Sequence, residues 1–505
     1  MKITGRNIYR GLPITIKTTA NGFIGLIHKS LFYLTHPFQK SRTGIYNREL
    51  LDEYNIQRPF GPRPQLCYAP FASMFFSVFG KVSPCYATYP KLKTRWQEST
   101  IKELWKSQDF QQIRKQVISK DLSDHCSFCH IPLINKNYGS MLARKYDHYQ
   151  FHVSKYPCIM EFELENTCNL QCIMCNGFLS SSIRQNREKN PPLPKQYDKR
   201  FVDQLEEFIP HLQVAEFTGG DPFLIDMYYD IWDRISAINP DCNLLITTNA
   251  NTYNEKVKKV LEQFKNICFN ISIDSLKKEV YEKIRVNGNF EKAMNNIAVF
   301  HNYCKKNGTT LNFLVCPLQV NWKEFPDFIS YGNANGISIY FHMVIKPENL
   351  ALWSMHSSEL KTVSEYLNSF DFPAGTPVEK QNRENYFHLA GLISTWYHKA
   401  IEREKDDNYK YKSIDTTEKE NLFVRSVLDF INKKNDPAKT ETIQKCELME
   451  KKIRAVFDEL PADFDKGQFL NHLLAMPLDD YMVNSIESTD ERTLSELIVN
   501  WIFYD

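Results

Sequence analysis

The sequence contains no long hydrophobic run. Its longest apolar stretch near the N-terminus, Phe23–Leu26, is too short for the apolar region of a secretory signal. No segment approaches the roughly 18 apolar residues of a membrane span. Neither charge predominates, because 62 basic side chains oppose 60 acidic ones and the net charge is only +2. These absences predict a cytoplasmic protein that binds neither a membrane nor a nucleic acid.

Disulfides are also not expected. The 13 cysteines are an odd number, and the cytoplasm keeps thiols reduced. Clustered cysteines in such a protein are typical of metal sites. The composition is otherwise ordinary, with 42% hydrophobic and 13% aromatic residues, which is enough for packed cores. At roughly 100–200 residues per domain, the 505 residues predict two to four domains.

Strand and helix patterns alternate along the middle of the chain. Six strands are predicted there: Ile159–Leu164, Val214–Thr218, Asn243–Thr248, Ile267–Ile273, Leu311–Cys316 and Ile337–Met343. Helices are predicted between them, at Met227–Ile238, Asn254–Phe264, Phe290–Lys306 and Glu324–Asn333. Such alternation indicates an α/β domain with parallel strands. Six units favour a partial (β/α)6 barrel over a complete barrel, which usually needs about 250 residues.

The flanking regions differ from this domain. We expect an N-terminal extension over residues 1–60, a cysteine-containing domain over 61–150, the core domain over 151–345 and a helical C-terminal region over 346–505. Within the second of these, Thr100–Val117 predicts one or two short helices. Near the C-terminus, Thr417-x-x-Glu420 predicts a capping box at a helix start. The charged run Glu402–Lys412 predicts a solvated linker.

Three cysteines follow the first predicted strand of the barrel with the spacing C-x3-C-x2-C: Cys168, Cys172 and Cys175. Three thiolates on one loop can hold three irons of a cubane cluster, which leaves the fourth iron without a protein ligand. An open coordination position can bind a substrate or cofactor. The loop also leaves the carboxyl end of a strand, where α/β barrels place their chemistry. The alternatives are a zinc knuckle, although no fourth cysteine or histidine follows at suitable spacing, and buried free thiols.

This triplet after a first strand resembles the signature of the radical S-adenosylmethionine (SAM) superfamily. In that family the cluster donates one electron to SAM, and the resulting 5′-deoxyadenosyl radical abstracts a hydrogen atom from the substrate. The resemblance implies a [4Fe-4S] cluster bound by the three cysteines and by the amino and carboxylate groups of SAM. It also implies a reductant such as flavodoxin or ferredoxin.

Further segments resemble the SAM-binding motifs of the same family. Gly219-Gly220-Asp221-Pro222 resembles the GGEP motif, with Asp221 in place of glutamate; the family contact there is to backbone, so we expect the change to be tolerated. Thr247-Thr248-Asn249 resembles the T-N pair near the SAM ribose, and Ser272-Ile273-Asp274 resembles the S-x-D pattern. Arg285 belongs to a segment that resembles I-R-x-x-G-x-F. Met174 stands where the family usually has an aromatic residue beside adenine, and a flexible thioether can pack there.

Four more cysteines lie upstream of the barrel: Cys67, Cys85, Cys126 and Cys129. The pattern Cys67-x12-Gly80-x4-Cys85 resembles the opening of the SPASM and twitch domains that accompany many radical SAM enzymes. It implies an auxiliary [4Fe-4S] cluster, which four thiolates would saturate. In the family this domain normally follows the barrel, whereas here it precedes it. A structural zinc ion bound by the four cysteines is the alternative.

Two residues near strand ends are weaker candidates. Cys316 ends the fifth predicted strand and is either a hydrogen-atom donor to a substrate radical, a role that the resemblance to epimerases of the superfamily implies, or, as we expect, a buried core cysteine. His342 lies near the end of the sixth strand and is either a general base or, as we expect, a core histidine. The remaining cysteines are predicted to be structural: Cys158, Cys242, Cys268, Cys304 and Cys446.

The leading hypothesis is a radical SAM enzyme that modifies a peptide or protein side chain, as family members with auxiliary clusters often do. A second hypothesis is a small-molecule dehydrogenase that acts on a sugar or aminocyclitol alcohol. A third is a non-catalytic metal-binding scaffold or electron carrier. The segments that resemble SAM-binding motifs count against the third hypothesis, since a carrier has no use for a SAM pocket.

Overall fold

The computed structural model describes residues 45–88, 92, 94–147, 149, 155–405, 415–460 and 466–475, with scattered positions between 483 and 494. The chain divides into two compact units. The first comprises Met1–Cys316, Asp327–His342 and Phe372–Arg383, and the second comprises Pro317–Pro326, Met343–Asp371 and Glu384–Asp505. Most of the predicted N-terminal extension therefore lies outside the described residues.

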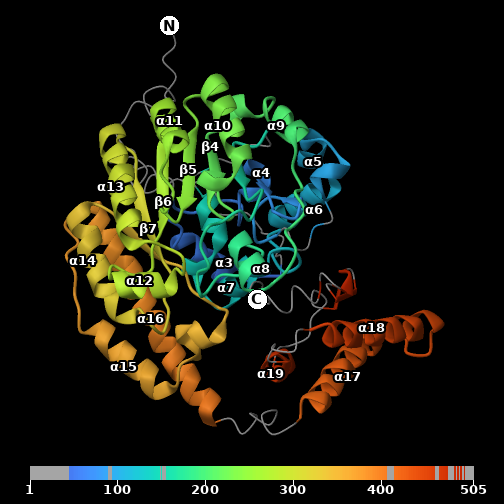
Figure 1. Ribbon diagram of the computed structural model, residues 1–505. Helices are drawn as coiled ribbons and strands as arrows, with labels where there is room; N and C mark the ends of the chain where they lie inside the picture. Colours follow the sequence, from blue (N-terminus) through green and yellow to red (C-terminus); the bar gives the residue numbers. More distant parts are fainter. Residues whose placement is uncertain are drawn as a thin grey trace. The chain divides into compact units, whose positions relative to one another are not determined.

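A sheet of eight strands organises the described part of the first unit (Figure 1). Its strand order is β2 (Val82–Ser83), β1 (Ser73–Phe76), β3 (Ile159–Phe162), β4 (Val214–Phe217), β5 (Asn243–Thr248), β6 (Ile267–Ser272), β7 (Leu311–Val315) and β8 (Ser338–Phe341). Strands β3 to β8 are parallel neighbours in chain order. The six predicted strands and the partial barrel are thus confirmed.

The strand β1 comes from the four-cysteine region and extends the barrel sheet. It is parallel to β3, with Ser73 opposite Ile159 and Phe76 opposite Phe162. The backbone N–H of Glu163 continues this ladder by donating to the Phe76 carbonyl at 2.9 Å. The region that precedes the barrel in sequence is therefore joined to it by backbone hydrogen bonds.

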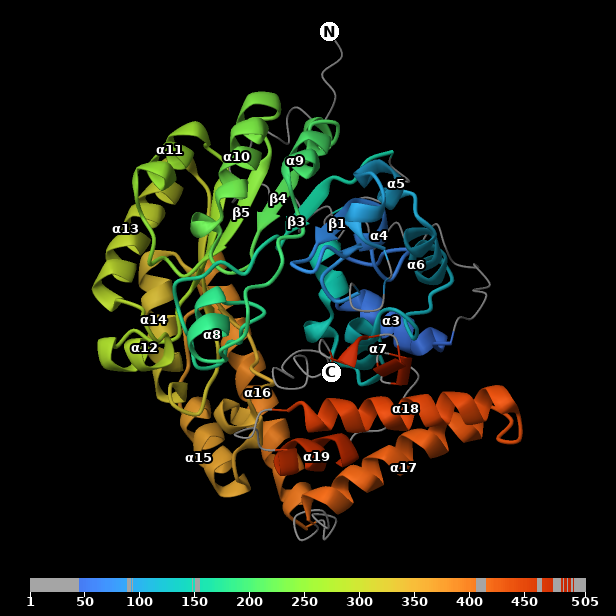
Figure 2. The same ribbon diagram turned by 45° about the vertical axis from the view of Figure 1, so that its right-hand side comes forward.

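Helices cover the outer face of the barrel sheet (Figures 1 and 2). They include α9 (Lys199–Leu205), α10 (Asp226–Ile238), α11 (Glu255–Gln263), α13 (Phe290–Asn307) and α14 (Phe325–Asn335). Phe162 of β3 packs against Phe201 of α9, with ring centroids 6.4 Å apart. Phe269 of β6 stacks on Phe300 of α13 at 4.7 Å. Because alternate residues of a strand face opposite sides, the residues that flank these two aromatics in the strands face the barrel interior.

The helix ends follow from local capping. Helix α13 begins after Asn289, whose side chain accepts from the Lys292 N–H at 2.7 Å, and it ends at Gly308, which has a φ of 69°. The one or two short helices predicted over Thr100–Val117 are confirmed: they are α5 (Ile101–Trp105) and α6 (Gln108–Ile118). The shorter helices of the first unit are α3 (Arg48–Ile56), α4 (Ala69–Ala72), α7 (Ser127–Ile134), α8 (Ser181–Asn186) and α12 (Lys278–Ile284).

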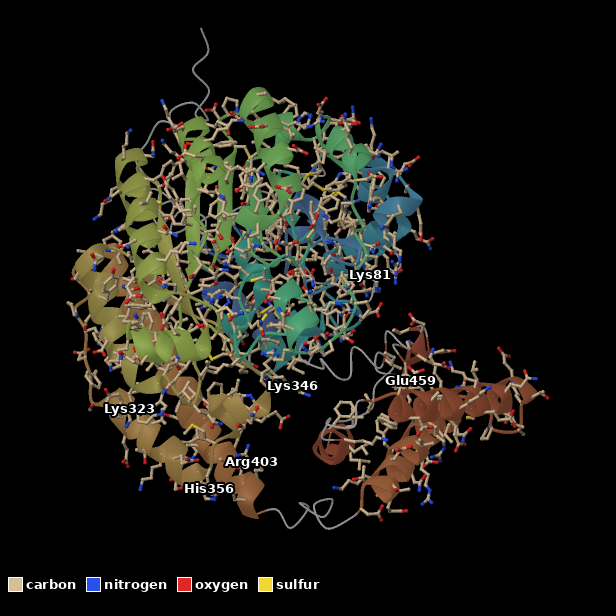
Figure 3. The ribbon with its side chains drawn as sticks, viewed as in Figure 1. Lys81, Lys323, Lys346, His356, Arg403 and Glu459 are labelled. Atoms are coloured by element: carbon tan, nitrogen blue, oxygen red, sulfur yellow. The ribbon has the colours of Figure 1, made fainter. Side chains whose placement is uncertain are left out.

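The C-terminal region is helical, as predicted. It contains α15 (Ser357–Asn368), α16 (Pro377–Lys405), α17 (Thr416–Lys434), α18 (Thr440–Asp458) and α19 (Lys466–Ala475). In the second unit, Arg403 of α16 donates to the Met355 carbonyl at 2.9 Å, next to His356 before α15 (Figure 3). Within the described ranges, no helix is both long and apolar enough to cross a membrane.

One prediction about this region is wrong, and a second is wrong for the residues that the structure describes. The Asp415 side chain, and not Thr417, caps α17, because it accepts from the N–H groups of Thr417 and Glu418 at 2.9 and 3.1 Å. The predicted linker Glu402–Lys412 overlaps a helix, since α16 continues to Lys405. The rest of that run lies outside the described residues.

Candidate active site at the carboxyl edge of the barrel

The cysteine triplet lies on the loop that leaves β3. On either side of Cys172, the N–H groups of Gln171 and Ile173 donate to the carbonyls of Val286 and Ile284, each at 2.9 Å. These paired bonds hold the cysteine loop against the segment that contains Arg285. Two motifs that are more than a hundred positions apart in the sequence therefore meet.

The three thiols are neighbours and are partly exposed. Burial raises the pKa of the Cys168 thiol to about 12, and the pKa of Cys175 is raised by burial and then by Cys172 and Cys168. Polar donors face two of the sulfurs: Asn249 Nδ2 lies 3.9 Å from Cys168 Sγ, and Arg285 Nη1 lies 3.9 Å from Cys172 Sγ. Such donors stabilise the thiolates that form when a metal displaces the thiol protons.

The donor set fits a cluster. Among the described residues, no three histidine, cysteine or acidic side chains are placed to hold a single metal ion. In a cubane cluster each thiolate binds a different iron. The cysteines that hold such a cluster therefore need not converge on one point, as the ligands of a single metal ion must. Three neighbouring thiols on one loop leave one corner of a cluster without a protein ligand, which is the position that SAM would take.

The loop Gly219–Pro222 packs directly against the cysteine loop. Gly220 has a φ of 27°, and a Cβ atom there would lie 2.1 Å from the Thr167 carbonyl oxygen. The Asp221 N–H donates to that same oxygen at 2.8 Å. Since only glycine tolerates both the backbone conformation and the approach, the motif requires glycine at this position.

The Asp221 carboxylate joins this loop to the end of β5. Its Oδ2 accepts from Thr248 Oγ1 at 2.7 Å and from the Asn249 N–H at 2.8 Å. Its Oδ1 accepts from the Phe223 N–H at 3.1 Å. Burial raises the pKa of this carboxyl, whereas the three donors lower it. The aspartate is therefore a structural link between two of the predicted motifs, a role that the sequence did not predict.

Asp274 and Arg285 form a buried ion pair beside the cysteine loop. Arg285 Nη2 lies 2.7 Å from Asp274 Oδ2, and Asp274 Oδ1 accepts from the Cys316 N–H at 2.7 Å. Burial raises the pKa of the Cys316 thiol, as do the charges of Asp274, Cys172 and Cys175. Three candidates from different strands and helices thus meet at the cysteine loop.

For the other candidate residues near this edge of the sheet, the structure gives fewer contacts with the rest of the site. Ser272 ends β6 opposite Leu314, and Met174 is a partly exposed residue of the cysteine loop. His342 follows β8 and donates its backbone N–H to the Val315 carbonyl at 2.8 Å. The His342 side chain is exposed, so the prediction of a core histidine is wrong.

The four upstream cysteines share one hydrophobic cluster. Cys67, Cys85 and Cys129 are buried in it, and Cys126 packs against it. Burial raises the pKa of the Cys67 thiol, and the charges of the other three cysteines raise it further. The four thiols are therefore neighbours in the structure, although Cys67 and Cys129 are more than 60 positions apart in the sequence.

Steric constraints explain why the upstream cysteine motif contains a glycine at position 80. Gly80 has a φ of 74°, and a Cβ atom there would lie 2.7 Å from Gln97 Nε2 and 3.1 Å from Gln196 Oε1. Gln97 Nε2 in turn donates to Gln196 Oε1 at 2.6 Å. The turn at Gly80 therefore sits under a contact between the four-cysteine region and the segment that follows the cysteine triplet.

The sequence analysis missed a set of carboxylates on the inner face of β3 and β4. Glu161 and Glu216 are opposite in register, and Lys145 Nζ bridges them at 2.8 and 2.7 Å. Glu163, two residues after Glu161, has its pKa raised to about 7 by burial. Strands of a parallel sheet covered on both faces are normally apolar throughout. The alternating glutamates after Ile159 were therefore a signal of a polar interior.

Arg187 was also missed, and no local pattern marks it. Its guanidinium donates to the Cys172 carbonyl at 3.3 Å and to the Cys175 carbonyl. It lies in an irregular segment after α8, and only the folding of that segment over the cysteine loop brings the two together.

Two family profiles match the chain. Residues 163–332 match the Radical SAM superfamily, and residues 67–130 match SPASM, an iron–sulfur cluster-binding domain. The fold and the matches define a radical SAM enzyme. The chain thus contains a radical SAM domain and, ahead of it in the sequence, a SPASM domain. A radical SAM domain binds a [4Fe-4S] cluster and SAM, and a SPASM domain binds auxiliary iron–sulfur clusters.

Curated relatives are distant. The GTP 3′,8-cyclase of Limosilactobacillus fermentum is 26% identical over 270 residues, which cover 50% of this chain and 75% of that protein. The GTP 3′,8-cyclase of Lactiplantibacillus plantarum is 27% identical over 209 residues, covering 40% of this chain and 59% of that protein.

Similarity to solved structures is also low. SuiB of Streptococcus suis bound to S-adenosylmethionine is 15% identical with a TM-score of 0.32, over 53% of this chain and 59% of that chain. Native anSMEcpe with bound AdoMet is 14% identical with a TM-score of 0.32, over 42% and 59%. The match thus spans about three fifths of each solved chain, and it carries no argument about the substrate.

Proposed function

We propose that Cys168, Cys172 and Cys175 hold a [4Fe-4S] cluster used for reductive cleavage of SAM, and that the protein modifies a peptide or protein side chain. The observation that carries this proposal is the meeting of the cysteine loop with Gly219–Pro222 and with the Asp274–Arg285 pair. When bound, the cluster and SAM supply a 5′-deoxyadenosyl radical. The chain's own residues set its surroundings.

These residues have distinct tasks in the proposal. Gly220 leaves room for the close approach of the two loops, and Asp221 ties Gly219–Pro222 to Asn249. Asn249 and Arg285 place hydrogen-bond donors beside two of the ligand sulfurs. Ser272, Asp274 and Met174 are assigned to the SAM site because they match the family motifs. Cys316 is proposed as a hydrogen-atom donor.

We assign the auxiliary cluster to Cys67, Cys85, Cys126 and Cys129. Their shared hydrophobic cluster supports this assignment. Four thiolates saturate a [4Fe-4S] cluster, which suits it to electron transfer rather than to substrate binding. The strand β1 connects this region to the barrel sheet, so the auxiliary site belongs to the same folded unit as the SAM site.

The inner face of the barrel bears on the choice of substrate. The curated relatives are named for a reaction of GTP, a polyanion. Carboxylates at Glu161, Glu163 and Glu216 would repel a triphosphate, and Lys145 neutralises only one of the charges that it bridges. A peptide side chain meets no such repulsion. An aminocyclitol does not either, so a small-molecule dehydrogenase is the second candidate. A cytoplasmic location and a flavodoxin or ferredoxin as reductant complete the proposal.

The first experiment is anaerobic reconstitution, with iron per chain and 5′-deoxyadenosine formation from SAM measured under a strong reductant. We expect about eight irons in the intact chain. A triple variant, Cys168→Ala with Cys172→Ala and Cys175→Ala, should keep about four irons and form no 5′-deoxyadenosine. A fully loaded protein that does not cleave SAM, or one that binds zinc in place of iron, would leave the scaffold hypothesis standing.

A second experiment separates the two substrate classes. The rate of 5′-deoxyadenosine formation is compared with peptide pools and with sugar and aminocyclitol alcohols as additions. Stimulation by peptides, with a mass change in a peptide, supports the leading proposal. Stimulation by an alcohol alone supports the small-molecule dehydrogenase.

A further inference from the structure

Three glutamates alternate at Glu161 in β3 and at Glu163 and Glu165 just after it, and two of the three have cationic partners. Glu161 Oε2 lies 2.8 Å from Lys145 Nζ, and Glu165 Oε1 lies 3.1 Å from Lys195 Nζ. Glu163 stands between them in the sequence. Across the described part of the chain, its carboxylate has no hydrogen bond and no ion pair.

The carboxyl of Glu163 faces the proposed active site. Phe162 points outward against Phe201 of α9, so the adjacent Glu163 points to the inside of the barrel. A Cβ atom on Gly219 would lie 3.2 Å from Glu163 Cγ, which puts the side chain beside the Gly219–Pro222 loop. The residue is partly exposed there. If the Gly219–Pro222 loop binds SAM, as proposed above, Glu163 would lie beside the bound SAM.

This position lacks a positive charge. An ionised carboxylate that is removed from water is costly unless a cation or several donors compensate it. The Lys145 group offers no compensation, because Glu161 and Glu216 share its single ammonium group and keep a net negative charge. Burial is accordingly the one cause that raises the pKa of Glu163. A bound amine or guanidinium would supply the missing partner.

We propose that Glu163 determines substrate specificity by binding a positively charged group, an amine or a guanidinium, of the substrate. The inference rests on the proposed function, because it places the substrate beside the SAM loop. It narrows the substrate class to peptides with lysine or arginine near the reacting position, or to amine-bearing small molecules.

The test measures equilibrium binding without turnover, on the cluster-loaded and SAM-bound protein in the absence of reductant. The probes are N-acetyl-glycyl-lysyl-glycinamide, its arginine analogue and its norleucine analogue, which has nearly the same shape and no charge. We expect the lysine or arginine probe to bind at least about tenfold more tightly than the norleucine probe, as charge-assisted hydrogen bonds do.

Variants of Glu163 test whether this residue causes the preference for a positively charged probe. Glu163→Gln should bind all three probes within about twofold of one another, since the amide keeps the shape and removes the charge. Glu163→Asp keeps the charge and should retain a weaker preference. The control Glu255→Gln, on α11 with a side chain that is 92% exposed, should behave as the unmodified protein does.

Two outcomes overturn the inference. One is the absence of a cation preference in the unmodified protein, or its persistence in Glu163→Gln. The other is a loss of SAM affinity in Glu163→Gln of more than about tenfold, because the carboxylate would then serve the amino group of SAM and not the substrate. Either result can be told apart from a failure of the proposed radical chemistry, which would show as a loaded protein that does not cleave SAM.

Discussion

Arg285 and Asp274 form an ion pair with an N–O distance of 2.7 Å, and their side chains are only 6% and 0% exposed. The carboxylate also accepts the Cys316 N–H, and the guanidinium lies beside Cys172 Sγ. One ion pair thus joins the segments that follow β6 and β7 to the cysteine loop. Its two charges compensate each other in a site from which water is largely excluded.

The first prediction concerns this pair. Arg285→Met leaves the Asp274 carboxylate buried without a cation, which typically costs about 3–5 kcal/mol in the free energy of unfolding. Chemical denaturation of the apoprotein measures the loss. The double variant Arg285→Met with Asp274→Asn should recover part of it, because no uncompensated charge is left. Lys278→Met removes one partner of the exposed pair with Glu291 and should have no measurable effect. If Arg285→Met and Lys278→Met lowered the free energy of unfolding equally, burial of the ion pair would not be the cause of the loss.

The second prediction concerns Gly220. In Gly220→Ala the new methyl group would meet the Thr167 carbonyl at 2.1 Å, so the Gly219–Pro222 loop and the cysteine loop must separate. We expect the variant to fold, to bind less iron and to lose most of its SAM affinity. Iron analysis and equilibrium dialysis with SAM measure both effects.

Gly308→Ala is the matched control. Gly308 also has a positive φ of 69°, but the described residues beyond its immediate chain neighbours place no atom within 4 Å of the added methyl group. It should therefore lose roughly 1 kcal/mol of stability from backbone strain and bind iron and SAM normally. Normal SAM binding by Gly220→Ala would show that the contact between the loops does not shape the SAM site.

The third prediction concerns the pH dependence of stability. Burial raises the pKa of Glu163 from 4.5 to about 7. A carboxyl whose pKa is raised by folding contributes stability below its unfolded pKa, and this contribution is lost as the pH rises through 7. Glu163→Gln does not titrate. As the pH rises from 5 to 8, the unmodified protein should therefore lose stability relative to Glu163→Gln. The expected loss in its free energy of unfolding is on the order of 1–3 kcal/mol.

Denaturation of the apoproteins at the two pH values checks this shift. Glu255→Gln, on the surface, should show no such pH-dependent difference. A constant difference between Glu163→Gln and the unmodified protein across the range would mean that the Glu163 carboxyl is ionised throughout, and that its surroundings compensate the charge.

The fourth prediction concerns Lys145. Its ammonium group lies between the carboxylates of Glu161 and Glu216, at 2.8 and 2.7 Å. Lys145→Met leaves these two carboxylates facing each other, which should cost several kcal/mol at neutral pH and less in acid, where one of them binds a proton. Lys136→Met, which removes an exposed partner of Glu53, should be nearly neutral. A loss that is the same at pH 5 and pH 8 would contradict this electrostatic account.

Local sequence determined much of this protein. The six barrel strands are short apolar runs with helical segments between them, and their hydrogen-bond ladders follow the predicted order. The cysteine triplet and the Gly219–Pro222 motif are each contiguous, so their resemblance to the motifs of the family is visible in the sequence itself. The glycines of that motif are needed for a close approach of the backbone, and such a requirement is visible in the sequence as glycine itself.

Only the tertiary structure decided which distant residues meet. The parallel pairing of β1 with β3 follows from backbone hydrogen bonds that any strand can offer, so no side-chain pattern predicts it. Asp221 links the Gly219–Pro222 loop to the end of β5 because the fold brings Thr248 Oγ1 within 2.7 Å of its carboxylate. Whether Glu161 of β3 or Glu165 after it has a cationic partner depends on Lys145 and Lys195, which come from other segments. Electrostatic interactions act through space, and the sequence does not record these distances.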